Sequence, residues 1–187
     1  TSITECVAIG VNALIGDGST APTGDYNIAI GSYSLDATTT GYSNVAIGYQ
    51  AGTAIIGAHS NIAIGYQALQ GDGTTAPTGA SNIAIGSNSL DAITSGASNV
   101  AIGKNAGTAL LGSNYNIAIG HKALETENLS HGNIAIGHET LQDQDSTVAN
   151  NVAVGYQAAH NLTSGTDSVY LGYQAGGAGV ITGDDNV

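Results

Sequence analysis

The chain lacks Phe, Trp and Met, so the large side chains that fill a wide globular core are missing from its 187 residues. Its single cysteine, Cys6, excludes a disulfide within the chain. Lys104 and Lys122 are the only cations against 14 acidic residues, and the net charge is −12. So few cations argue against binding to nucleic acid or to an anionic membrane surface. No apolar stretch is long enough for membrane insertion.

What the chain has in abundance is a repeat. The motif Asn-Ile/Val-Ala-Ile/Val-Gly is spaced mostly by 17 residues, once by 18, and by 21 at two insertions. It begins at Asn27, Asn44, Asn61, Asn82, Asn99, Asn116, Asn133 and Asn151, with degenerate copies at Cys6 and Ser168. The insertions at residues 16–24 and 71–79 are near copies, which indicates that a block of three repeats was duplicated. We therefore expect residues 1–187 to be one repetitive segment of a longer fibre protein.

The motif alternates with period two and is rich in β-branched residues, which predicts a short strand that ends at the glycine. A second apolar segment follows, as in Gln67-Ala68-Leu69, and predicts a second strand. Two strands and two turns in 17 residues make one coil of a β-solenoid. About ten coils at the strand spacing of roughly 4.8 Å give a rod about 50 Å long. The predicted fold class is therefore all-β, a parallel β-roll.

The faces of the strand can be assigned from its alternation. The Ile/Val residues at the second and fourth positions share one face, which we expect to fill the interior. The third position carries Ala in every copy except at Tyr170, and we expect this column to face a partner chain. The position four residues after the strand glycine carries Leu in some coils, as at Leu35, and Gly in others, as at Gly52. Because an aliphatic pair such as Ile55-Ile56 follows Gly52, we expect it to replace the missing core volume.

The sequence Asn-Val-Ala-Ile-Gly-Tyr-Gln-Ala at residues 44–51, with a close copy at 61–68, resembles the YadA-like head repeats of trimeric autotransporter adhesins. Similar 17-residue units occur in bacteriophage tail fibres. The resemblance covers essentially the whole chain and implies a left-handed parallel β-roll in a homotrimer of side-by-side rolls. It also implies an extracellular location, on a virion or a bacterial cell surface. The longer coil and the two insertions depart from the adhesin pattern.

Two columns of polar residues recur along the predicted rod. The motif asparagines, Asn27, Asn44, Asn61, Asn82, Asn99, Asn116, Asn133 and Asn151, are expected to form a structural hydrogen-bond ladder. The position after the strand glycine carries Tyr49, Tyr66, Tyr156 and Tyr173. These rings suit coil packing, and they are also the candidates for surface recognition of a host receptor or glycan.

Metal and cofactor sites are not expected. His121 and His138 occupy the tyrosine position in adjacent coils and could share an ion, but no carboxylate or thiolate stands at a matched position in both coils. Asp17 and Asp72 lie in the Gly-Asp-Gly insertions, where one Asp per loop supplies too few oxygens for calcium. These four residues are the weak candidates for metal ligands.

The sequence thus predicts a non-enzymatic, structural or adhesive segment of a trimeric fibre, a stiff spacer that contributes to host or surface attachment. No nucleophile-elbow, phosphate-loop or metalloprotease motif is present. One alternative is an ice-binding solenoid, since Thr38-Thr39-Thr40 and Thr74-Thr75 are present, although no Thr column recurs in successive coils. The other is a polysaccharide-degrading tailspike, which would need clustered acids in a groove.

Overall fold

The computed structural model describes residues 4–53, 55–72, 77–126, 131–142, 150–163 and 165–177. Each copy of the motif forms one strand of three residues, and the last residue of each strand precedes the motif glycine. The strands are β1 Val7–Ile9, β2 Ile28–Ile30, β3 Val45–Ile47, β4 Ile62–Ile64, β5 Ile83–Ile85, β6 Val100–Ile102, β7 Ile117–Ile119, β8 Ile134–Ile136, β9 Val152–Val154 and β10 Val169–Leu171. Within the described residues, no helix has the length and apolar character needed to cross a bilayer.

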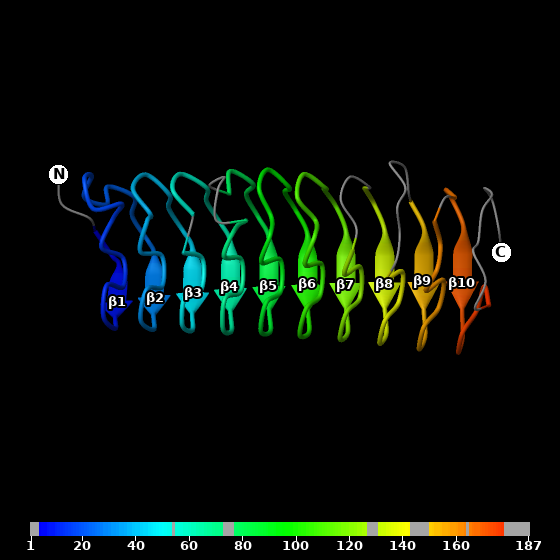
Figure 1. Ribbon diagram of the computed structural model, residues 1–187. Helices are drawn as coiled ribbons and strands as arrows, with labels where there is room; N and C mark the ends of the chain where they lie inside the picture. Colours follow the sequence, from blue (N-terminus) through cyan, green and yellow to red (C-terminus); the bar gives the residue numbers. More distant parts are fainter. Residues whose placement is uncertain are drawn as a thin grey trace.

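All ten strands belong to one parallel sheet, in which each strand pairs with its neighbours in sequence (Figure 1). The register aligns every motif with itself: Val45 pairs with Ile62 between β3 and β4. The same alignment holds across the 21-residue spacing between β4 and β5, where Ile62 pairs with Ile83. The insertions are therefore absorbed between the strands without shifting their register. This confirms the prediction of a parallel β-solenoid with coils of about 17 residues.

The interior of the roll contains the alanines, so the expectation that Ile and Val fill it and the expectation that the alanines face a partner chain were both wrong. From β2 to β9 the central Ala of each strand is at most 1% exposed. The flanking residues lie on the outer face, where Ile47 and Ile102 are 36% and 37% exposed. The cause is the thinness of the coil, because a Cβ added to Gly52 on the opposite wall would lie only 3.6 Å from the Ala46 Cβ. A β-branched side chain in place of Ala46 would be too wide for the space between these walls.

The predicted second strand of each coil was also wrong. The segment after the motif glycine forms a turn, because positive φ angles recur at alternate residues, as at Gln50 (54°) and Gly52 (61°). An extended strand cannot contain this conformation. The turns still stack by backbone hydrogen bonds between coils, for example from the Gly52 N–H to the Ala68 carbonyl at 2.9 Å.

The expected exchange of volume between core positions is confirmed in two coils. Ile55 and Leu110 are buried, and their Cδ1 atoms lie 3.1 and 2.9 Å from where a Cβ would stand on Gly52 and Gly107. Leu35 and Leu90 occupy the position of these glycines in the preceding coils and are fully buried. The roll thus keeps its interior filled by alternating which turn residue is large.

Two carboxyl groups of the turns are partly buried, which disfavours their charged form. Asp36 and Asp91 follow Leu35 and Leu90, and burial raises the pKa of both carboxyls above the ordinary value. One oxygen of each lies buried without a hydrogen-bond partner, whereas the other oxygen of Asp91 accepts from Asn88 Nδ2 at 3.2 Å.

We expect Asp91→Asn to stabilise the chain at neutral pH by less than about 1 kcal/mol, since solvent screens a partly buried charge. A folded-state pKa above the unfolded one means that stability falls as pH rises through the folded pKa. The gain should therefore be present at pH 7 and vanish at about pH 3, below the ordinary Asp pKa of about 3.9. Thermal unfolding at the two pH values measures it. Glu5→Gln, which removes an exposed charge, is the control for net charge, and an equal gain in both variants would contradict the prediction.

Candidate functional site

The motif asparagines lie inside the roll and bond to one another along its axis. Asn44 donates from its backbone N–H and from Nδ2 to the Asn27 Oδ1 at 2.9 and 3.2 Å. Its Nδ2 also donates to the Ala58 carbonyl at 2.9 Å, across the coil. The backbone N–H of every later asparagine in the column donates in the same way to the preceding Oδ1. The eight asparagines are at most 1% exposed, so their amides hold the coils together and do not face solvent.

The degenerate motifs extend this column at both ends. The Cys6 sulfur accepts the Asn27 N–H at 3.3 Å, in place of an amide oxygen. At the other end the Ser168 N–H donates to the Asn151 Oδ1 at 3.1 Å, and the hydroxyl of Ser168 donates to the Thr166 carbonyl. The column of hydrogen bonds therefore spans all ten coils, although only eight of them carry asparagine.

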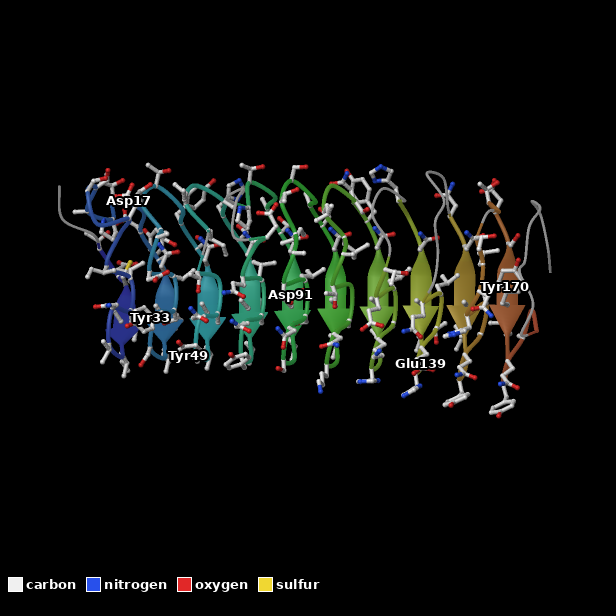
Figure 2. All side chains as sticks on the ribbon, in the orientation of Figure 1. Asp17, Tyr33, Tyr49, Asp91, Glu139 and Tyr170 are labelled. Atoms are coloured by element: carbon white, nitrogen blue, oxygen red, sulfur yellow. The ribbon has the colours of Figure 1, made fainter. Side chains whose placement is uncertain are left out.

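The position after the strand glycine, just past the C-terminal end of each strand, carries exposed rings in two groups of coils, separated by Ser87 and Lys104. Tyr49 and Tyr66 stack with centroids 5.6 Å apart, and Tyr156 and Tyr173 stack at 5.3 Å. All four tyrosines are exposed, Tyr173 the most at 73%. Figure 2 labels Tyr49 and, farther along the same side of the roll, Glu139. An aromatic column with free hydroxyl tips suits saccharide or protein contact, and its regular stacking also serves coil packing.

His121 and His138 continue this column between the two tyrosine pairs. Their centroids are 5.0 Å apart, and His138 stacks on Tyr156 at 5.2 Å. Next to the rings runs a second column of amides, in which Gln67 donates to Gln50 and Gln174 to Gln157, each at 2.9 Å.

In the second column, Glu139 directly follows His138, and the sequence reasoning did not count it as a candidate ligand. The residue after each column tyrosine is Gln, at positions 50, 67, 157 and 174, so the change to Glu beside His138 was the available signal. Gln157 Nε2 donates to Glu139 Oε2 at 2.7 Å, and this hydrogen bond, aided by the charges of His138, His160 and Lys122, lowers the pKa of the carboxyl. The carboxylate is therefore ionised at neutral pH, beside two imidazoles.

The first Gly-Asp-Gly insertion folds around its own aspartate. Asp17 Oδ1 accepts the backbone N–H groups of Ser19 and Thr20 at 2.9 and 2.6 Å, and the Ser19 hydroxyl at 2.8 Å. The backbone bonds lower the pKa of this exposed carboxyl. Asp17 thus serves as the acceptor of a local turn. Asp72 lies at the equivalent place, but residues 73–76 of its loop lie outside the described residues.

Two further tyrosines border a shallow hollow that the sequence reasoning did not single out. The hollow measures about 380 Å³ and is lined by Thr23, Gly24, Asp25, Tyr26, Thr40 and Tyr42. Tyr42 stacks on His59 of the next coil with centroids 4.7 Å apart. Of the threonine run singled out for ice binding, Thr38 and Thr39 are buried, so two of its three hydroxyls do not form an exposed row.

The outer face of the sheet presents two continuous apolar rows along the roll. Its two rows are the first and third residues of each strand, all of them Ile, Val or Leu, and no charged residue lies in either row. Between β2 and β9 these side chains are half-buried or exposed. Nine spacings of about 4.8 Å make the face roughly 45 Å long. Comparisons of the chain with protein-family models, curated proteins and solved structures found no match.

Proposed function

We propose that this chain is a structural and adhesive segment of an extracellular trimeric fibre, in which three left-handed β-rolls pack side by side. The observation that carries the proposal is the uncharged Ile/Val face of the sheet. Its two rows extend over ten strands without a polar interruption. Apolar patches beyond a few hundred Å² are rare on monomeric proteins and mark interaction surfaces.

The occupant of this face that fits best is a second copy of the same chain. Side chains on this sheet face repeat once per coil, so the surface of a rigid partner must have protrusions and depressions with the same spacing. A second copy of the chain has the same spacing because it has the same repeat. Homo-oligomers usually assemble with closed symmetry, so a ring of identical copies is expected. The resemblance of the repeat to trimeric adhesin heads and tail-fibre repeats supports three copies and a virion or bacterial surface as the setting of the proposal.

The proposed work of the segment is mechanical. A roll held by continuous backbone and asparagine hydrogen bonds, with no catalytic constellation in its motifs, serves as a stiff, non-enzymatic spacer. The exposed tyrosines of the ring column, Tyr49, Tyr66, Tyr156 and Tyr173, lie past the C-terminal ends of the strands and would stay available for a host receptor or glycan.

Sedimentation equilibrium of the 187-residue chain tests the assembly. We expect a mass three times the 18.4 kDa of one chain. The double variant Ile47→Glu/Ile102→Glu places carboxylates on the apolar face, where desolvating them costs several kcal/mol per ion, so it should sediment as a monomer. A wild-type chain that remains a folded monomer would overturn the proposal.

Ile56→Glu is the matched control for this experiment. Ile56 is 39% exposed, close to the 36% and 37% of Ile47 and Ile102, but it lies in a turn away from the strand face. The control should keep the trimer mass. Circular dichroism verifies that all variants retain the wild-type fold, which separates loss of assembly from unfolding. A control that dissociates as readily as the double variant would place the interface elsewhere.

A further inference from the structure

The histidine pair in the ring column carries polar atoms that the fold leaves unused. The Nδ1 atoms of His121 and His138 are both shielded from solvent, and neither has a hydrogen-bond partner. Burying a polar atom without a partner costs free energy, so such atoms in a native structure call for an explanation. Aromatic stacking does not explain why histidine is present, because tyrosine stacks equally well at the same position in other coils.

Glu139 brings a carboxylate to these nitrogens. Its backbone has a positive φ of 53°, which places its side chain next to that of the preceding residue, with Oε2 3.7 Å from His138 Nδ1. One donor atom from each of His121, His138 and Glu139 lies within 4.8 Å of the other two. All three residues are half-buried, so water can still reach the cluster.

We propose that His121, His138 and Glu139 bind a divalent transition-metal ion of the zinc type. Two imidazoles and a carboxylate are ligands that zinc takes in proteins, and three protein ligands leave the fourth tetrahedral position for water. Bonds of about 2.1 Å bring tetrahedral donors to roughly 3.4 Å from one another, so the side chains must close on the ion from their present separation. Half-buried side chains on a turn have the freedom to do so. The site does not depend on the proposed fibre function.

The charges around the cluster are compatible with a cation. Glu139 is ionised, and its Oε2 accepts a hydrogen bond from the Gln157 amide and lies beside His138 Nδ1. The nearest ammonium, that of Lys122, is paired with Glu125 Oε2 at 3.1 Å. The Glu125 carboxylate also accepts hydrogen bonds from Gln142 and Asn105. Glu125 therefore keeps the Lys122 ammonium next to the cluster and away from its three donor atoms.

The repeat itself supplies variants that remove the ligands and keep the fold. In four other coils the two positions read Tyr-Gln, so His138→Tyr/Glu139→Gln restores a pair that this solenoid already accepts. The probe is zinc chloride, titrated at pH 7.5 by calorimetry, with cobalt substitution giving an optical spectrum of the coordination. We expect the wild type to bind one zinc ion per chain and the double variant to bind at least about a hundredfold more weakly, because two of three ligands are gone.

His59→Gln is the control that removes a histidine elsewhere, and it should bind zinc as the wild type does. The converse variant, Tyr49→His/Tyr66→His/Gln67→Glu, rebuilds the same set in the coils of β3 and β4 and should gain a second ion per chain. Equal zinc binding by the wild type and by His138→Tyr/Glu139→Gln would overturn the proposal, as would a wild type that binds no zinc. The mass of the assembly, measured on the same samples, tests the fibre proposal separately.

Discussion

Asn99→Asp is expected to destabilise the solenoid by about 3–5 kcal/mol at neutral pH, although it changes a single NH₂ group into oxygen. The Asn99 Nδ2 donates to the Asn82 Oδ1 at 3.1 Å and to the Ser113 carbonyl at 2.7 Å. A carboxylate would place a buried negative oxygen against both acceptors and leave them without a donor. The other oxygen would still accept from Asn116, as the Asn99 Oδ1 does at present.

The destabilisation by Asn99→Asp should increase with pH, whereas a simple loss of packing would cost the same at every pH. Two facing acceptors favour the neutral acid, so the pKa of the introduced carboxyl should lie above its unfolded value of about 3.9. A group whose pKa is raised in the folded state loses stability as pH rises through that pKa. The penalty should therefore be small near pH 4 and full at pH 7.

Unfolding by denaturant at both pH values, at one chain concentration, measures the effect. Asn12→Asp adds the same charge at an exposed turn residue and should cost little. Asn99→Ala removes the whole amide and should be destabilised at every pH, because the Asn116 N–H then loses its acceptor as well. An Asn99→Asp variant as stable as Asn12→Asp at pH 7 would show that the column contributes little to folding.

The sequence was sufficient to predict the solenoid because the repeat is nearly invariant in length and in its strand residues. Each coil contacts only its neighbours, so the 17-residue period fixed which residues stack. The alternation also separated the two strand faces correctly. It could not assign which face points inward, since Ala and Asn fit a narrow interior as well as a surface, and the width of the coil depends on the turn.

Residues of the turns were harder to predict for a local reason. Gln50 and Leu35 adopt positive φ angles that their residue types seldom take, so nothing in their identity marked a turn where a second strand was expected. Glu139 was not counted as a ligand although its change from Gln was visible in the sequence. Its contact with His138 depends on the φ of the turn, whereas the stacking of His121 on His138 follows from the repeat alone.

The glycine that follows each strand is expected to tolerate a methyl group poorly. Gly103 has a φ of 137°, and an added Cβ would lie 2.5 Å from the carbonyl oxygen of Gly120 and 2.7 Å from its carbon. Both atoms belong to the backbone of the next coil, which cannot move without breaking the hydrogen bond from the Gly120 N–H to the Ile102 carbonyl at 2.8 Å. Backbone strain and overpacking together should make Gly103→Ala about 3–6 kcal/mol less stable.

Gly172→Ala separates the cost of backbone strain from the cost of overpacking against the next coil. Gly172 stands at the same place in its coil, with a φ of 123°, but no described atom lies within 4 Å of its added Cβ. This variant should therefore carry the backbone strain alone, of order 1–3 kcal/mol, and the difference between the variants measures the close stacking of coils. Denaturant unfolding of the 187-residue chain compares them. Equal losses would mean that the coils can separate enough to admit a methyl group, and that the glycine column is kept for its φ angle alone.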